Sequence, residues 1–214
     1  MVVLFIFIAS ILSILSPISH AVTSTSLAVK DSYVDSFYPV TNYGQQDWLI
    51  FGDYLMGPTE AYIEFTTYPP PTGWTKAEIQ IDMYSVINTT ELTISLVTVV
   101  WSEFTVTWAT KPAIGTQITT LTVSANQTYT IDVTNFVTGR TIAINIAATS
   151  FPTGYVQATS REGNTGTNQG PTLIWTHPGY GPAIPGFSLL FLVCLMIGAC
   201  TYIILRMKKH PRHL

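Results

Sequence analysis

The segment K-A-E-I-Q-I-D-M-Y at residues 76–84 decides the fold class of this chain. Apolar side chains occupy every second position from Ala77 to Met83, and polar or amphipathic side chains occupy the positions between them. A period of two is typical of a β-strand with one buried face and one face toward water. The same period recurs at 129–134 and 141–147, so the sequence predicts several half-buried strands.

Further strands are expected where threonine, valine, isoleucine and aromatic residues gather, because these residue types favour strands. Turns rich in glycine, proline and asparagine separate them, and no segment between 22 and 176 has a convincing helical period. Many short strands joined by such turns indicate an all-β antiparallel sandwich. The additional expected strands are 26–34, 47–52, 60–65, 92–99, 101–108, 117–123, 154–159 and 171–176.

The N-terminal end is apolar almost throughout residues 1–16, and the small-residue pattern Ser19-His20-Ala21 follows. This arrangement is typical of a secretory signal peptide. The sequence therefore predicts a signal peptide at residues 1–21, with cleavage between Ala21 and Val22. An uncleaved N-terminal membrane anchor is the alternative interpretation.

The C-terminal end carries an uncharged apolar run at 187–205, and the basic tail 206–214 follows at once. A helix of about 20 apolar residues crosses a bilayer core, and basic residues stay on the cytoplasmic side. We therefore expect a transmembrane helix at 187–205, with the C-terminus inside the cell and the bulk of the chain outside. A short Pro/Gly stalk at 177–186 would join the helix to the exterior domain. A buried core helix is the alternative.

The tripeptide Pro185-Gly186-Phe187 stands where the apolar run begins. Together with the apolar run and the basic end, it resembles the PGF-type sorting signals of archaeal surface proteins. The resemblance implies that a membrane enzyme removes the helix and that the mature protein carries a lipid. A plain transmembrane anchor is the alternative, because Pro-Gly also punctuates helix starts. Under either interpretation, the protein is tethered to the cell surface.

The segment between the two ends, residues 22–176, is acidic. It carries all twelve Asp and Glu residues and five basic residues, which gives a net charge of −7. Such a charge argues against nucleic acid or anionic lipid as partners, and it suits neutral glycans, basic proteins or a divalent cation. Both cysteines, Cys194 and Cys200, lie in the apolar C-terminal run, so the exterior segment has no disulfide and no thiol nucleophile.

Five motifs follow one another along the exterior segment. They are D-S-Y-V-D with T-N-Y-G at 31–44, A-Y-I-E-F at 61–65, W-S-E-F-T-V-T-W-A-T-K-P at 101–112, I-D-V-T at 131–134, and S-R-E-G with G-P-T-L at 160–173. Together they resemble the DNRLRE-type domain, which is related to carbohydrate-binding module family 96 and to the disaggregatase-related surface proteins of archaea. The resemblance covers roughly residues 25–176 and implies a jelly-roll-like β-sandwich. It also implies structural roles for the motif residues Trp101, Glu103, Trp108, Asp132, Arg161 and Glu162.

The motif at 101–112 is interpreted as a strand that ends at a Lys-Pro turn. In a strand, Glu103 shares a face with Trp101, whereas Phe104, Val106 and Trp108 share the opposite face. We expect the face with Trp108 to point into the core.

Catalytic chemistry has few candidate residues in the exterior part. Its one histidine, His177, lies at the stalk, which excludes a Ser-His-Asp triad and a histidine-rich metal site. A glycosidase needs two carboxylates that face each other across a sugar, and Glu103 and Glu162 are the candidates for such a pair. The favoured alternative is that Arg161 and Glu162 form structural ion pairs.

Oxygen ligands for a cation gather near the first motif. Asp31, Asp35 and Asn42 could join backbone carbonyls around a structural Ca²⁺, which accepts oxygen ligands in loose geometry. The favoured alternative is that the two aspartates form turns and accept hydrogen bonds from backbone amides.

Aromatic residues in or beside the predicted loops are candidates for stacking on sugar rings. We select Tyr43, Trp48, Trp74 and Tyr155 as ligand-binding candidates. The sequons at Asn88 and Asn126 are candidate glycosylation sites.

These observations favour a cell-surface-anchored, non-catalytic β-sandwich that binds carbohydrate or serves as a structural part of the cell envelope. Two alternatives stay open. The first is an enzyme that acts on surface polysaccharide, as the disaggregatase relatives imply. The second is an adhesion domain that binds protein.

Overall fold

The computed structural model describes residues 21–178, except 55–56, 68–71, 150–153 and 164–168. The chain divides into two units, residues 21–178 and a unit made of 1–20 and 179–214, and every described residue belongs to the first. The sorting tripeptide, the predicted transmembrane helix and residues 1–20 of the predicted signal peptide lie outside the described residues. Among those described, no helix is long and apolar enough to cross a membrane.

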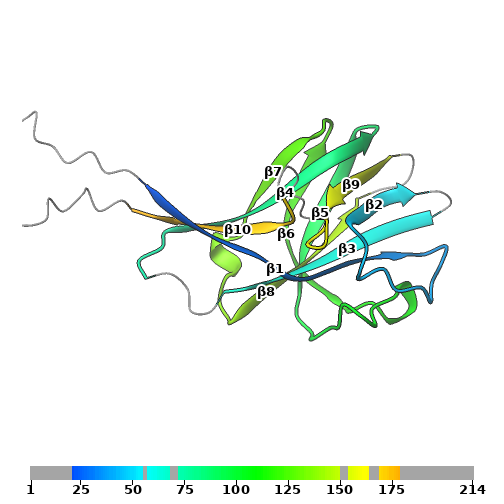
Figure 1. Ribbon diagram of the computed structural model, residues 1–214, viewed down its shortest axis with the longest axis horizontal. Coiled ribbons are helices and arrows are strands. Elements are labelled where there is room, and N and C mark those ends of the chain that lie inside the picture. Colours follow the sequence, from blue (N-terminus) through cyan, green and yellow to red (C-terminus); the bar gives the residue numbers. More distant parts are fainter. Residues whose placement is uncertain (1–20, 55–56, 68–71, 150–153, 164–168, 179–214) are drawn as a thin grey trace, which may run out of the picture. The chain divides into compact units, whose positions relative to one another are not determined.

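Ten β-strands and two short 3₁₀ helices make up the described unit (Figure 1). All strand pairings are antiparallel, so the prediction of an all-β antiparallel sandwich is confirmed; the finer jelly-roll description stays a prediction. The elements are β1 (Val22–Asp35), β2 (Trp48–Tyr54), β3 (Gly57–Thr66), β4 (Lys76–Ile87), β5 (Thr90–Val97), η1 (Trp108–Thr110), β6 (Ile114–Val123), β7 (Gln127–Asp132), η2 (Thr134–Phe136), β8 (Thr141–Ala148), β9 (Tyr155–Thr159) and β10 (Thr172–His177).

Strand β1 joins the two layers of the sandwich because it changes partner along its length. Up to Leu27 it pairs with β10, and from Ala28 to Asp35 it pairs with β3. A bulge between Ala28 and Lys30 marks the change. One layer contains β10, β4, β9 and β7, and the other contains β3, β8, β5 and β6, while β2 pairs with both β9 and β3.

Alternating side chains from both layers meet in one core. Ile79, Ile81 and Met83 of β4 are fully buried in the same cluster as Ile144 and Ile146 of β8. Burial of each such side chain contributes about 1.5–3 kcal/mol relative to leaving it exposed. The period of two in the sequence therefore identified the inward face of these strands correctly.

A second, smaller cluster lies on the outward face of β3 and β8. Tyr62 of β3 and Ala143 of β8 pack there with Trp101 and Val106, which belong to the segment between β5 and β6. Because this segment covers the outward face, β3 and β8 are buried on both sides over most of their length.

The covering segment is not a strand, so the prediction of a strand at 101–108 is wrong. The chain there forms turns that lead into η1. Val106 N donates a hydrogen bond to Ser102 O over 2.9 Å, and the side chains of Thr107 and Thr110 bond to each other. Hydrogen bonds within the segment thus satisfy backbone polar groups. In a strand, the same groups would need a neighbouring strand as their partner.

The predicted division of this segment into two faces is wrong for the same reason. Trp101, Glu103 and Val106 are all buried, whereas Phe104 is 63% exposed and Trp108 is half-buried. A strand would place Glu103 and Val106 on opposite faces, but turns allow both side chains to point toward the sheet.

The other predicted strands are present, with shifted ends. Strand β1 begins at Val22 rather than at residue 26, and β6 begins at Ile114 rather than at 117. Strand β10 includes His177, which the sequence analysis assigned to the stalk. Pairing with Val22 extends β10 to this residue.

Candidate functional site

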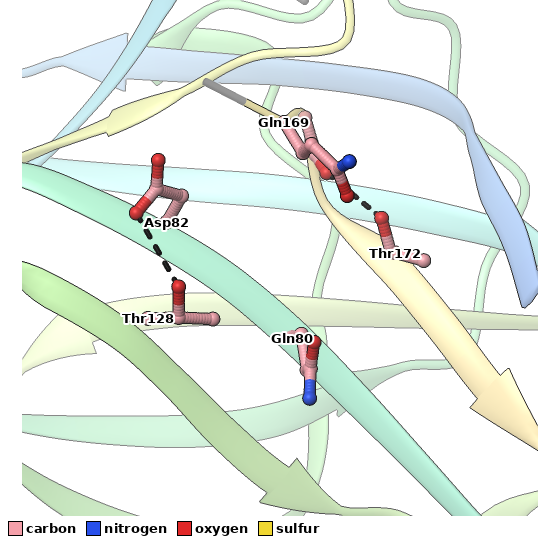
Figure 2. Close-up of a pocket in the computed structure, with 6 residues that line it drawn as sticks. Gln80, Asp82, Thr128, Gln169 and Thr172 are labelled. Carbon is pink, nitrogen blue, oxygen red and sulfur yellow. Dashed lines mark hydrogen bonds between the residues drawn. The ribbon is translucent and has the colours of Figure 1, made fainter. Parts of the chain in front are cut away.

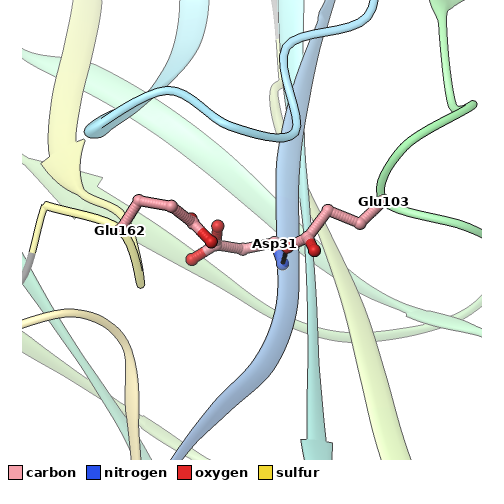
Figure 3. Close-up of side chains that lie close together, drawn as sticks. All are labelled: Asp31, Glu103 and Glu162. Atoms are coloured by element: carbon pink, nitrogen blue, oxygen red, sulfur yellow. Dashed lines mark hydrogen bonds between the residues drawn. The ribbon is translucent and has the colours of Figure 1, made fainter.

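Three of the sequence motifs meet beside the bulge of β1. Asp31 lies on β1, Glu103 lies on the segment between β5 and β6, and Arg161 and Glu162 follow β9. Oxygens of the three carboxylates lie within 4.8 Å of one another, and Figure 3 shows Glu103 and Glu162 approaching Asp31 from opposite sides. We call these four residues the carboxylate–arginine cluster.

The cluster binds the backbone of β1 where this strand changes partner. Asp31 N donates to Glu103 Oε1 over 2.9 Å, and Arg161 Nη1 donates to Val29 O over 3.0 Å. Ladder pairing is interrupted at a bulge, and backbone groups there need other partners. Two long side chains therefore supply hydrogen bonds to the strand beside its bulge.

Arg161 contacts all three carboxylates. Its Nη2 donates to Glu103 Oε2 over 3.0 Å, its Nε donates to Glu162 Oε1 over 2.9 Å, and its backbone N donates to Asp31 Oδ2 over 2.7 Å. A single residue thereby connects the loop after β9 with β1 and with the segment between β5 and β6. The expectation that Arg161 and Glu162 form an ion pair is confirmed.

Burial controls the electrostatics of the cluster. Asp31 is 1% exposed, and burial raises its pKa to about 8; the hydrogen bond from Arg161 N opposes this shift, and the Glu162 carboxylate adds to it. The pKa of Glu103 is also raised, first by burial, while Asp31 N and the charge of Arg161 oppose the shift. Three carboxylates share one guanidinium, so the cluster favours a proton on Asp31 at neutral pH.

The residues expected to bind Ca²⁺ do not come together as one set. Asp35 Oδ1 accepts a hydrogen bond from Phe37 N over 2.8 Å, and Asn42 Nδ2 donates to the carbonyl oxygens of Glu103 and Val106, each over 2.7 Å. Within the described residues, the acidic groups close enough to share a cation are instead the three carboxylates of the cluster. Such oxygens suit Ca²⁺, but the guanidinium of the cluster already places a positive charge among them.

The two tryptophans of the 101–112 motif lie next to lysines. Lys30 Nζ is 5.8 Å from the ring centre of Trp101, and Lys111 Nζ is 3.4 Å from the ring centre of Trp108. Lys111 also forms an ion pair with Glu60 of β3. These cation–π and ionic contacts hold the covering segment on the sheet.

Asp132, the remaining motif residue, is the last residue of β7 and lies two residues before η2. Its Oδ1 accepts a hydrogen bond from Thr134 N over 2.9 Å. Hydrogen bonds from the side chain and backbone of Thr134 lower the pKa of Asp132. Its carboxylate thus bonds to the start of η2, and the structural role that the resemblance implies stays a prediction.

The four aromatic candidates do not form one binding platform. Three of them pack against another aromatic ring: Tyr43 stacks on Tyr33 at 4.3 Å between ring centres, Trp74 meets Trp175 edge-on at 5.1 Å, and Tyr155 meets Tyr54 edge-on at 4.9 Å. Trp48 is 38% exposed at the start of β2. Most of this aromatic surface is therefore used for packing within the domain.

A polar hollow lies on the outward face of the layer that contains β4, β7 and β10 (Figure 2). Its volume is about 270 Å³. The lining residues carry amide, carboxylate and hydroxyl groups or expose backbone; they are Gln80, Asp82, Thr128, Gln169, Gly170 and Thr172. Thr172 Oγ1 donates to Gly170 O over 3.0 Å, and Thr128 Oγ1 donates to Asp82 Oδ1 over 3.5 Å.

Sequence reasoning missed this hollow, although its signal was present. Gln80, Asp82 and Tyr84 occupy the polar positions of the period-two pattern in 76–84, and they face outward in β4. Tyr84 is 36% exposed, and its pKa is raised first by partial burial and then by Tyr155. An exposed aromatic ring thus lies near the hollow on the same strand.

The two sequon asparagines lie in exposed turns. Asn88 adopts a left-handed backbone conformation (φ 66°) between β4 and β5, and Asn126 precedes β7. Asn126 Oδ1 accepts a hydrogen bond from Val86 N over 2.9 Å. Of the predicted processing sites, Ala21 and Val22 are described and Val22 opens β1, whereas Pro185, Gly186 and Phe187 lie outside the described residues.

Comparison with known proteins identifies the family of the described domain. The model of carbohydrate-binding module family 96 matches residues 22–176, which is most of the chain and extends from the first residue of β1 into β10. Among curated proteins, none matches this sequence. The match agrees with the resemblance carried by the five motifs, three of which build the carboxylate–arginine cluster. The chain belongs to carbohydrate-binding module family 96.

Proposed function

We propose that this protein is a non-catalytic carbohydrate-binding module held at the outer cell surface. The observation that carries the proposal is the family match over residues 22–176. The family supplies the ligand class, and the polar hollow is the place on the described domain whose chemistry suits a sugar.

The polar hollow supports a neutral, hydroxyl-rich ligand. Gln80 and Gln169 offer amides that both donate and accept hydrogen bonds, and Asp82 offers an acceptor for sugar hydroxyls. Among the described residues, no lysine or arginine lines the hollow, so an anionic sugar would meet the Asp82 carboxylate without a neighbouring cation. Its volume is below the roughly 300–1,000 Å³ of pockets for small molecules, so we expect it to hold a short stretch of a polymer and to bind weakly.

The state of the acidic residues supports a non-catalytic role. Glu103 and Glu162, which the sequence offers as a glycosidase pair, both bind to Arg161. The side chain of Glu103 is 4% exposed. A sugar placed between these carboxylates would have to displace the guanidinium and open a buried cluster.

The proposed location follows from the two ends of the chain. A signal peptide at 1–21 would release a chain that starts at Val22, where β1 begins. A helix at 187–205 with a basic end would then anchor the protein with its domain outside, or a sorting enzyme would replace the helix by a lipid. The segment between β10 and the predicted helix, residues 178–186, is short, so the domain would stay close to the membrane.

The test is titration of segment 22–178 with a panel of neutral and acidic envelope polysaccharides. We expect binding of a neutral polymer that hardly changes with salt, because neutral hydrogen bonds and stacking are little screened. The double variant Gln80→Ala/Thr172→Ala should lose this binding, and Thr122→Ala, on the other layer, should retain it. Binding that is unchanged in the double variant would place the site elsewhere, and release of new reducing ends from the polymer would refute the non-catalytic role.

A further inference from the structure

A lysine, a glutamate and an asparagine meet on the outward face of β3 and β8. Lys111 Nζ donates a hydrogen bond to Glu60 Oε1 over 2.5 Å, and Asn145 Nδ2 donates to Glu60 Oε2 over 3.2 Å. Glu60 lies on β3, Asn145 lies on β8, and Lys111 directly follows η1. The two oxygens of one carboxylate therefore hold an amine and a side-chain amide that come from different elements.

The sheet and the covering segment close most of this site. Asn145 is 1% exposed and Glu60 is 9% exposed. Tyr62, which lies opposite Asn145 in the register of β3 and β8, donates its hydroxyl to Glu60 Oε2 over 2.9 Å. The ring of Trp108 covers Lys111 Nζ from the other side. The amine, the carboxylate and the amide are thus held together in a fixed arrangement, which makes a reaction between them effectively unimolecular.

These three groups are the ones that a bond between the lysine and asparagine side chains requires. A lysine amine is a nucleophile once it has lost a proton, and the amide carbon of asparagine is an acceptor for it. A carboxylate that contacts both nitrogen atoms can carry protons from one to the other, as a general base and then as a general acid. Glu60 contacts both nitrogen atoms here.

We propose that Lys111 and Asn145 form an isopeptide bond within the domain, with Glu60 as the proton carrier. Glu60 accepts a proton from the Lys111 ammonium group, and the amine attacks Asn145 Cγ. Glu60 passes this proton to Nδ2 and accepts a second proton from Nζ while the Cγ–Nδ2 bond breaks. Ammonia leaves and takes the second proton. A lysine ammonium group and an amide thus give a secondary amide and an ammonium ion, with no oxidant or reductant.

Such a bond would fix the covering segment to the sheet. The segment 22–176 contains no cysteine, so a disulfide cannot hold it. In the absence of a covalent bond, Lys111 is held by an ion pair with Glu60 and by its contact with Trp108. A covalent link from Lys111 to β8 restricts the unfolded chain as a disulfide does, and thiols do not reduce it.

Peptide mapping of the purified full-length chain by mass spectrometry tests the proposal. Trypsin cleaves after Arg140 and does not cleave before proline, so Lys111 and Asn145 fall in the separate peptides 77–140 and 141–161. We expect the two peptides to be recovered as one linked species, with a mass lower than their sum by one ammonia molecule. Fragmentation should place the link between Lys111 and Asn145.

Two variants with a matched control identify the groups that form the bond. Glu60→Gln should lack the linked species, because glutamine cannot accept the lysine proton. The control Glu64→Gln, which changes the other outward glutamate of β3 paired with a lysine, should retain it. Lys111→Arg keeps the charge but cannot form the bond, and it should melt at a lower temperature than the wild type.

The wild-type chain alone can refute the proposal. If its peptides 77–140 and 141–161 are recovered only as separate species with their full masses, the bond does not form, whether or not any variant folds. A linked species that persists in Glu60→Gln at the level of the wild type would equally overturn the role of Glu60 and with it the proposed reaction.

Discussion

Arg161 Nη2 donates a hydrogen bond to Glu103 Oε2 over 3.0 Å, across 58 residues of sequence. This contact closes the loop after β9 over the segment between β5 and β6, at the bulge of β1. Both layers of the sandwich depend on β1, so the ion pair lies at the joint between them. Loss of this ion pair should therefore destabilise the connection between the two layers, and its effect should not be confined to a single loop.

Removal of the guanidinium should destabilise the domain. We expect Arg161→Ala to lower the free energy of unfolding by about 2–3 kcal/mol, less than the roughly 3–5 kcal/mol for a fully buried pair, because water partly screens the exposed guanidinium. The control Lys76→Ala breaks the more exposed pair with Glu78 and should leave stability almost unchanged, because exposed ion pairs contribute little. Denaturant titration measures both, and equal losses would contradict the role given to Arg161.

The stability of the domain should fall as pH rises through the neutral range, because of Asp31. Its pKa is about 8 in the folded chain against 3.8 in the ordinary carboxyl, so between these values the folded state binds a proton that the unfolded state has released. The contribution of Asp31 to the free energy of unfolding is therefore fully present at and below about pH 4, and it is lost as the pH rises to about 8. Asp31→Asn should remove this slope.

The measurement is thermal melting of the wild type and Asp31→Asn across this range of pH. The difference between the two should change steadily from acid to mildly alkaline pH in favour of the variant. A difference in melting temperature that is constant with pH would show that the pKa of Asp31 is the same in the folded and unfolded chain.

Trp101 should be the tryptophan of the 101–112 motif on which folding depends most. It is 7% exposed and packs in the cluster outside β3 and β8, so Trp101→Ala should cost about 3–5 kcal/mol through the cavity left behind. The neighbouring Val100 is 97% exposed, and Val100→Ala should be nearly neutral. Trp108→Ala should fall between them. A larger effect at Trp108 than at Trp101 would restore the strand-based assignment of the inward face.

Calcium should distinguish the wild type from Arg161→Ala. In the wild type the guanidinium already lies among the three carboxylates, so we expect added Ca²⁺ or a chelator to leave the melting temperature unchanged. In the variant the same carboxylates, with oxygens within 4.8 Å of one another, lose their cation, and Ca²⁺ should restore part of the stability. Destabilisation of the wild type by a chelator would instead establish a resident metal.

The sequence alone determined the fold class and the inward faces of the regular strands. In β4 the apolar positions Ala77, Ile79, Ile81 and Met83 were readable, because a strand alternates its side chains whatever its neighbours are. The absence of histidine and cysteine between residues 22 and 176 also removed whole classes of catalytic site without any structure.

Tertiary structure alone decided the path of 101–108. An alternating polar and apolar segment fits a strand, but here turns with local hydrogen bonds place Glu103 and Val106 on the same side. An argument from sequence periodicity assumes that the backbone is extended throughout the segment, so it does not reveal that the chain forms turns instead.

Tertiary structure also decided which functional groups meet. The sequence grouped Asp31 with Asp35 and Asn42 because they are close along the chain, whereas the fold surrounds Asp31 with Glu103 and Arg161. The polar hollow likewise joins β4, β7 and the residues before β10. Periodicity gives the face of each strand, but long-range pairing determines which faces become neighbours, and that pairing results from the packing of the whole core.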